Sequence, residues 1–125
     1  IPVALAAASP YEAQLREGAA LVAARLGCAD HRLAYQSRSG SPRDPWLDPD
    51  INDVVREEAA RGRRDLLVVP LGFVCDHVEV LYDLDIEAKQ IADASGIGFV
   101  RAETVNDHPS FVRMMAQVIA ERVRA

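Results

Sequence analysis

The sequence has 125 residues and a mass of 13.6 kDa, which is the size of one domain with a single hydrophobic core. Half of its residues are apolar, 26% are charged, and the formal net charge is −5. This acidic balance argues against a nucleic-acid-binding protein, which normally carries a basic face.

Two further classes of protein are disfavoured by the sequence. No apolar stretch approaches the ~20 residues that a membrane span needs, and no segment has the regions of a signal peptide. The two cysteines, Cys28 and Cys75, fit neither a disulfide framework nor a zinc site. We therefore expect a cytoplasmic protein without a membrane span.

The first half of the chain is expected to hold two helices, a short strand and a long loop. Ser9 and Glu12 match a capping box around Pro10, and Gly27 is typical of a helix end. Three prolines and a glycine interrupt the segment 37–50, which predicts an irregular loop long enough to be functional. The expected elements are a helix over 9–26, a strand over 32–36, this loop, and a helix that is capped by Asp48 or Asp50 and ends at Ala60.

The second half alternates between strands and helices. Residues 65–70 (DLLVVP) form a continuous apolar run, which is typical of a strand buried on both faces of a parallel sheet. The expected elements are strands over 65–70 and 98–102, and helices over 76–94 and 109–123. The opening IPVAL is interpreted as the tail of another strand. This alternation predicts an α/β fold in three layers, a parallel sheet with helices on both faces, whose ligands bind beyond the carboxyl ends of the strands.

The helix expected over 76–94 carries three carboxylates on one face. Glu79, Asp83 and Glu87 are four residues apart, so in an α-helix they drift by only about 40° per step. Apolar residues flank this acidic stripe, with Val78, Tyr82 and Ile86 on one side, and Val80, Leu81, Leu84, Ala88, Ile91 and Ala92 on the other. A narrow stripe between apolar surfaces should face a cleft inside the protein, where its oxygens could bind a divalent cation or relay protons.

Structural roles remain open for the same residues. Asp76 and Glu79 also match a capping box, in which Glu79 only closes the helix start. Asp83 and Glu87 could form an ordinary solvated face. His77, at a helix start, is more typical of a structural residue than of a ligand.

Three other residues of this segment depart from a simple pattern. Asp85 and Lys89 fall within the apolar arc of the helix, where an i,i+4 ion pair or a local π-bulge would accommodate them. Cys75 precedes the helix without a partner pair for nucleophilic chemistry, so we interpret it as a small buried residue.

Three ordered segments of the sequence resemble the ferrochelatase family. LLVVPLGFVCDHVEVLYDLDIEA is similar to the family's strand, its GFxxDHxExLYxxD motif and its acidic helix. AYQSRSGSPRDPWLDPDI is similar to its YQS or WQS strand, Gly/Pro loop and PWLxP segment, and RAETVNDHPSFVRMMAQVI to its RxExxNxxPxF C-terminal helix. The resemblance covers nearly the whole chain. It implies a chelatase-like, Rossmann-like half-domain of an enzyme, a lyase that inserts Fe²⁺ into coproporphyrin III or protoporphyrin IX in haem biosynthesis.

The resemblance also assigns roles to individual residues. It implies that Glu79 is the active-site carboxylate and that His77 of the DH motif acts with it. Glu79, Asp83 and Glu87 would be the metal ligands, with Fe²⁺ as substrate, and Asp83 and Glu87 could hold a second divalent cation such as Mg²⁺. The implied porphyrin-binding residues are Trp46, Phe73 and Tyr82, although Trp46 could equally be a structural hydrophobic anchor.

The family pairs this half with a second, similar α/β domain, which carries an essential histidine in an (A/S)HS(I/L)P segment. This chain begins at the Ile-Pro that would follow that histidine. We therefore expect residues 1–125 to form the C-terminal domain, to need a porphyrin and the N-terminal domain as partners, and to be inactive alone. Some bacterial members carry an iron–sulfur cluster, for which the two cysteines of this chain supply no ligand set.

Two other functions compete with this interpretation. A small single-domain cobalt chelatase that acts as a homodimer would have this length, but His31, His77 and His108 lie in three different segments and form no evident pair. A phospho-acceptor receiver needs an Asp at the end of its central strand and a Lys after a late strand. Here the central strand ends in VVPLG and the only lysine, Lys89, lies within a helix, which disfavours a receiver.

Overall fold

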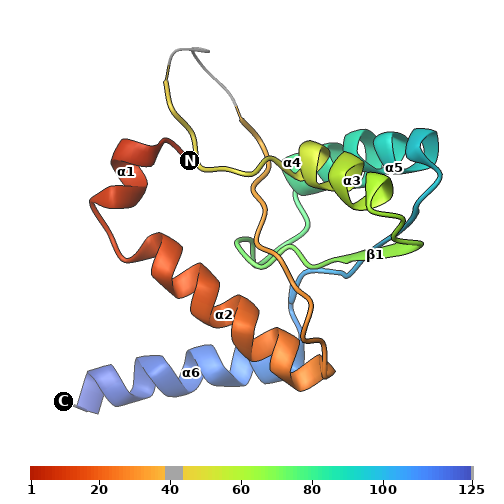
Figure 1. Ribbon diagram of the computed structural model, residues 1–125. Helices are drawn as coiled ribbons and strands as arrows, with labels where there is room; N and C mark the ends of the chain where they lie inside the picture. The colour runs from red at the N-terminus through yellow and green to blue at the C-terminus, as the bar shows by residue number, and fades with distance from the viewer. Residues whose placement is uncertain (39–43, 125) are drawn as a thin grey trace.

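A computed structural model describes residues 1–38 and 44–124 of the chain. Its elements are α1 (Val3–Ala7), α2 (Tyr11–Leu26), α3 (Ile51–Ala60), β1 (Asp65–Val68), α4 (Val78–Val80), the π-helix η1 (Leu81–Ala88), α5 (Lys89–Ser95), β2 (Gly98–Arg101) and α6 (Pro109–Arg124) (Figure 1). None of these helices is long and apolar enough to cross a membrane. The expected loop over 37–50 includes residues 39–43, which lie outside the described part of the chain.

The two strands lie side by side and parallel. Asp65 pairs with Gly98 and Val68 pairs with Arg101, and the connection between the strands is the continuous helix formed by α4, η1 and α5. A parallel pair needs such a crossover, because its second strand must start at the same end as the first. The predicted α/β fold with a parallel sheet is therefore confirmed.

The helices α3, η1 and α5 cover one face of this sheet. Their core consists of Ile51, Val55, Val80, Leu84, Ala88, Ala92 and Ile97, which are all buried. Leu66, Val68 and Phe99 reach this core from the sheet. The helix that carries the acidic stripe is thus held by its apolar side against both the sheet and α3.

The opposite face of the sheet is open within the described residues. Leu67 is 57% exposed and Val100 lies beside it with a similar exposure, so the expected burial of 65–70 on both faces is wrong for this chain. The strand side chains alternate, and the helices that the structure describes pack against one of the two sides. Figure 1 shows α6 extending away from the layer of α3 and α5, and the side chains of α6 are exposed or half-buried along its whole length.

The first residues of the chain form a helix. The expected strand tail IPVAL is instead α1, and Pro2 forms an isolated antiparallel bridge with Trp46. The strand expected over 32–36 is likewise reduced to a single bridge between Tyr35 and Asp50. Both segments therefore contact the neighbouring loop through one bridge each.

Helix ends follow the sequence signals more closely than helix starts do. α2 ends at Gly27 and α5 at Gly96, both with positive φ, which glycine adopts without steric cost. Asp50 caps α3 as expected, since its side chain accepts a hydrogen bond of 2.9 Å from the Asn52 N–H. The capping box expected at α2 does not form, because the Glu12 carboxylate pairs with Arg16 one turn along the helix.

The middle of the crossover helix is wound as a π-helix. Its buried positions Val80, Leu84, Ala88 and Ala92 recur every four residues. In a uniform α-helix such positions drift by about 40° per step, so the last would lie about 120° from the first. A π-helix bonds residue i to i+5 and holds more residues per turn, which cancels part of this drift. The acidic stripe precedes these positions by one residue each, so it stays aligned for the same reason.

Two leucines of η1 provide a test of this winding. Leu84 is 2% exposed in the core, whereas Leu81, expected on the same apolar side, is 42% exposed. We expect Leu84→Ala to lower the free energy of unfolding by about 2–5 kcal/mol, because it leaves a cavity. Leu81→Ala should cost less than about 1 kcal/mol. Urea unfolding followed by circular dichroism measures both, and equal losses would contradict the π-helical arrangement.

Candidate functional site

The site begins where β1 leads into the crossover helix. His77 is the N-cap residue of α4, and its Nδ1 accepts a hydrogen bond of 3.2 Å from the Glu79 N–H. The His77 ring packs edge-on against Phe73, with ring centroids 4.4 Å apart. The proposed capping box of Asp76 and Glu79 is therefore wrong. His77 satisfies the helix start, and the Glu79 carboxylate is not needed as a cap.

The three acids of the stripe differ in their surroundings. The Glu79 side chain is exposed, whereas Asp83 and Glu87 are half-buried. Asp83 accepts hydrogen bonds from the Ser37 hydroxyl and, at 3.4 Å, from the Gln36 amide. Among the described residues, no three His, Cys, Asp or Glu side chains are close enough together to form a metal-binding group. The stripe is therefore a row of separate carboxylates and lacks the closed ligand set of a structural metal site.

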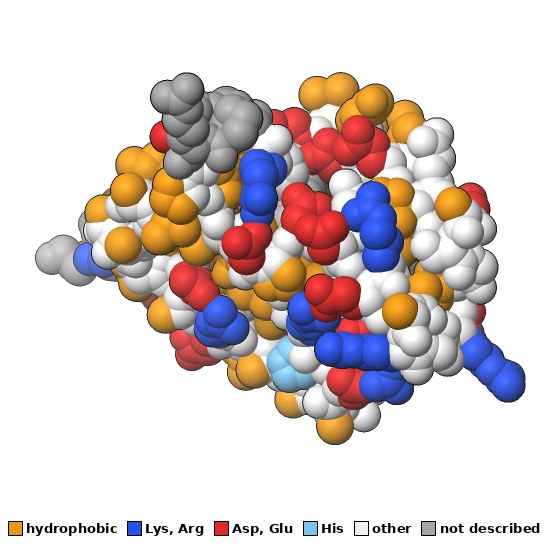
Figure 2. Space-filling model, turned by 45° about the horizontal axis from the view of Figure 1, so that its top comes forward, with side chains coloured by type: hydrophobic (Ala, Val, Ile, Leu, Met, Phe, Trp, Pro, Cys, Tyr) orange, Lys and Arg blue, Asp and Glu red, His pale blue; other side chains and the backbone are white. Residues whose placement is uncertain are grey.

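The surface around the stripe is apolar and uncovered. Val78 is 77% exposed, and Tyr82, Ile86 and Leu81 are also exposed. The described residues do not form the expected cleft along the whole stripe, because Ser37 and Gln36 contact only Asp83, and the surface beside Glu79 is uncovered. Figure 2 shows acidic and basic side chains gathered on one face, with apolar side chains between and around them. Exposed apolar surface beside charged groups is typical of a binding surface.

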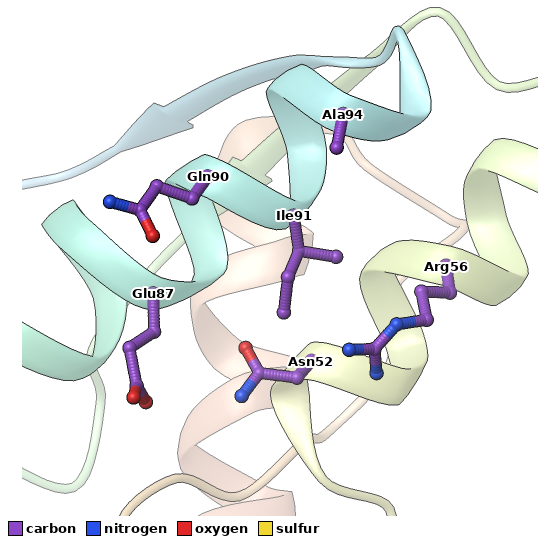
Figure 3. Close-up of a pocket in the computed structure, with 6 residues that line it drawn as sticks. All are labelled: Asn52, Arg56, Glu87, Gln90, Ile91 and Ala94. Carbon is purple, nitrogen blue, oxygen red and sulfur yellow. The ribbon is translucent and has the colours of Figure 1, made fainter.

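A shallow pocket lies at the far end of the stripe. It has a volume of about 400 Å³ and is lined by Asn52 and Arg56 of α3, Glu87 of η1, and Gln90, Ile91 and Ala94 of α5 (Figure 3). The Asn52 Oδ1 atom is buried and has no hydrogen-bond partner among the described residues. The sequence analysis identified Glu87 but not Asn52 and Arg56. These two residues reach the pocket only through the packing of α3 against α5, which no pattern in the neighbouring sequence indicates.

The substrate-binding residues expected from the resemblance lie in three different segments. Phe73 and Tyr82 flank the start of the acidic stripe, in the loop before α4 and in η1. Trp46 is half-buried in the segment that pairs with Pro2. Cys75, expected to be buried, is exposed, as is Cys28.

A half-buried arginine connects the sheet to the loop before α4 and to η1. Arg101, the last residue of β2, forms hydrogen bonds of 2.6 and 2.7 Å with Asp85 and one of 2.9 Å with Asp76. Sequence reasoning anticipated a local partner for Asp85 and did not find Arg101. The other charged residue of the apolar arc, Lys89, pairs with Asp93 one turn further on. The RxExxN pattern in the C-terminal segment begins at Arg101 and was the sequence signal that could have drawn attention to this residue.

The loop after β2 completes this network. The Asn106 Oδ1 accepts a hydrogen bond of 3.0 Å from the Asp76 N–H. The Asn106 side-chain amide also donates a hydrogen bond of 3.4 Å to the Asp76 carboxylate. Desolvation acts to raise the pKa of Asp76, but this hydrogen bond and the positive charge of Arg101 outweigh it, so the pKa lies below its ordinary value. The carboxylates beside it raise the pKa of Arg101, with Asp85 as the main cause. Both charges are thus stabilised in the folded state.

Comparisons with known proteins agree with this architecture. A family model described as ferrochelatase matches residues 1–123. The chain belongs to the ferrochelatase family. Ferrochelatase from Rhodopirellula baltica is 46% identical over 124 residues, which is 98% of this chain and 35% of the relative. Coproporphyrin III ferrochelatase from Nocardia farcinica is 45% identical, over 98% of this chain and 37% of the relative.

The coverage of a third relative is similar. Coproporphyrin III ferrochelatase from Mycobacterium leprae (strain Br4923) is 47% identical over 111 residues, which is 89% of this chain and 33% of that protein. The chain thus spans about a third of the length of the curated ferrochelatases that it matches.

The Arg101–Asp76 pair predicts a specific pH dependence of stability. Because the folded state lowers the pKa of Asp76, its contribution is complete above the ordinary value of 3.8 and is lost as the pH falls through the lower folded value. We expect the loss of unfolding free energy between about pH 5 and pH 2 to be smaller in Asp76→Asn than in the unsubstituted chain. Urea unfolding across this range measures the loss. Asp53→Asn, which removes an exposed pair with Arg56, is the control and should leave the slope unchanged.

Proposed function

We propose that this chain is the C-terminal chelatase-like domain, residues 1–125, of a cytoplasmic enzyme that inserts Fe²⁺ into a porphyrin in haem biosynthesis. The observation that carries the proposal is the row of carboxylates that starts at Glu79 beside uncovered apolar surface. Membership of the ferrochelatase family supports it, and two of the relatives described above are coproporphyrin III ferrochelatases. Coproporphyrin III or protoporphyrin IX is the proposed substrate.

The uncovered apolar surface supports a flat, largely apolar ligand. A porphyrin presents two broad apolar faces and a centre of four nitrogen atoms. Val78 and Tyr82 are exposed next to Glu79, and Phe73 lies in the loop before it. We propose that Phe73 and Tyr82, together with Trp46, contact the macrocycle. A second, N-terminal domain would then cover the ligand from its other side and complete the cleft.

The hydrogen bond at the helix start favours a division of roles between two residues. His77 accepts the Glu79 N–H at Nδ1, so in its neutral form the proton lies on Nε2. His77 therefore orients the helix start and offers a donor, and it has no free acceptor nitrogen for a proton. The Glu79 carboxylate is exposed and makes no hydrogen bond within the described part of the chain. We assign the proton acceptor to Glu79 and the orienting role to His77.

Metal insertion is balanced by the loss of protons. Fe²⁺ replaces two pyrrole N–H protons, which must leave the macrocycle while the ion loses its water ligands. Desolvation under a bound macrocycle favours the protonated form of a carboxyl group, which allows it to accept protons near neutral pH. Glu79 would take each proton in turn, and Asp83 and Glu87 would pass protons to solvent or present Fe²⁺ to Glu79.

A second divalent cation at Asp83 and Glu87 would have few protein ligands. Asp83 already accepts hydrogen bonds from Ser37 and Gln36, and no three candidate ligands converge in the described residues. Mg²⁺ commonly keeps most of its water and binds one or two carboxylates. We propose that any such ion is held at Glu87 and Asp83 as a hydrated ion, and the catalytic steps above do not depend on it.

Glu79→Gln in the two-domain enzyme tests the proposed proton acceptor. We expect kcat for Fe²⁺ insertion to fall by about 10²–10⁴-fold, because the amide cannot take up a proton. Porphyrin fluorescence quenching on insertion measures the rate. Glu17→Gln, an exposed acid on α2, is the matched control and should retain the unsubstituted rate. A rate for Glu79→Gln within threefold of the control would remove Glu79 from the mechanism.

The chain alone should not perform the reaction. The apolar surface beside Glu79 would leave a bound macrocycle open to water on one side. We expect the purified 125-residue chain to insert neither Fe²⁺ nor Zn²⁺ into porphyrin, and to gain activity when the N-terminal domain is added or fused. Insertion by the chain alone, as a dimer in analytical ultracentrifugation, would instead support a small homodimeric chelatase.

A further inference from the structure

One residue outside the acidic stripe brackets the segment that carries Glu79. Arg101 bonds to Asp76, three residues before Glu79, and to Asp85, six residues after it. The Arg101 side chain is 11% exposed, and three of its nitrogen atoms point to carboxylate oxygens. A single guanidinium at the end of β2 therefore holds both the loop before α4 and the middle of η1.

The geometry of this contact is specific for arginine. Nε and Nη2 bond to the two oxygens of Asp85 at 2.6 and 2.7 Å, while Nη1 bonds to Asp76 and to the Ala102 carbonyl. Such a two-point fork fixes the direction of the carboxylate as well as its distance. Lysine supplies the charge without the fork.

The fork also acts on the winding of the helix. Asp85 directly follows the buried Leu84, so the helix has to place a core residue and a carboxylate that reaches β2 at adjacent positions. The loosely wound η1 meets both requirements. A tighter α-helical winding would rotate Asp85 relative to the core contacts that precede it. Asn106 fixes the other end of the segment through the Asp76 N–H.

From these contacts we infer that Arg101 is a positioning residue for the acidic stripe. It clamps Asp76 and Asp85 to the carboxyl end of β2, keeps residues 81–88 in the π-helical winding, and thereby sets the location of the Glu79 carboxylate. This inference deepens the proposed function and rests on it for its kinetic consequences. The effect on helix winding is independent of that function.

The kinetic experiment uses substitutions in the two-domain enzyme. Arg101→Gln should lower kcat by about 10- to 100-fold, since a displacement on the order of 1 Å in a reacting group has this effect. The KM for porphyrin should stay within about threefold, because Arg101 does not belong to the apolar surface. Arg101→Lys should recover part of the lost kcat. Asp85→Asn keeps Arg101 and its bond to Asp76, so it provides the test if Arg101→Gln does not fold.

A matched control separates positioning from the general loss of an ion pair. Arg32 also bonds to two carboxylates distant in sequence, those of Glu57 and Glu58 on α3, and has no bond to the 76–85 segment. Arg32→Gln should leave kcat within about twofold. The double variant Arg101→Gln/Asp85→Asn should be no slower than Arg101→Gln, because both substitutions remove the same Arg101–Asp85 contact. Multiplicative losses, or an equal loss in Arg32→Gln, would overturn the inference.

A structural measurement distinguishes this inference from the proposed function. A crystal structure of Arg101→Gln or Asp85→Asn should show residues 81–88 rewound toward an α-helix and the Glu79 carboxylate displaced. Retention of the π-helix and of Glu79 within about 0.5 Å in both variants would overturn the positioning role. If the unsubstituted enzyme inserts no metal, the proposed function fails, and this structural result still decides the role of Arg101.

Discussion

Two rows of side chains on one helix, each with a spacing of four residues, impose the main constraint on this structure. The buried row needs to stay on the core, and the acidic row one position earlier needs to stay aligned on the surface. In an α-helix the four buried positions would drift by about 120° in total, because four residues exceed one of its turns. The π-helix η1 meets both requirements. It is stabilised by the packing of Leu84 and Ala88 in the core and by the hydrogen bonds between Arg101 of β2 and Asp85. Core, acids and arginine thus depend on one another.

Much of the apolar surface of the chain remains exposed. Leu67 and Val100 on the open sheet face and the apolar residues of α6 meet water in the described structure. Burial of apolar surface stabilises a protein by roughly 25 cal/mol per Å². An isolated domain that leaves such surface exposed to water loses this stabilisation. The exposed residues beside Glu79 belong to the same pattern. Together they favour a domain that completes its core and its site through contacts with further protein.

The fold could be predicted from the sequence where local signals are strong. The apolar run before Pro70 and the glycines Gly27 and Gly96 place β1 and two helix ends correctly, because these signals lie within or directly beside the elements that they mark. The prediction of a strand over 32–36 was wrong, because a strand forms only where a neighbouring strand supplies hydrogen-bond partners. α1 was missed because IPVAL fits a strand or a helix equally well over five residues.

The candidate site was predictable in its residues and less so in its geometry. The carboxylate spacing identified the stripe, but an α-helical wheel placed Leu81 in the core, where only the π-helical winding shows it to be exposed. Asp85 and Lys89 in the apolar arc left a local π-bulge open as one alternative, and the four-residue period of the buried positions is a further signal for it. The Arg101 contacts join residues 16 and 25 positions apart, so a local pattern can mark Arg101 but cannot name its partners.

The crossover that bears the acids is also the only route by which β2 reaches β1. Pairing of these parallel strands joins residues that the whole connection separates, so it is a non-local contact of the fold. Arg101 ends β2, and its contacts with Asp76 and Asp85 are made across the same connection. The strand pairing and the arginine network therefore depend on the same long-range contacts. A substitution in this helix that alters the metal chemistry acts on a segment that the fold itself needs.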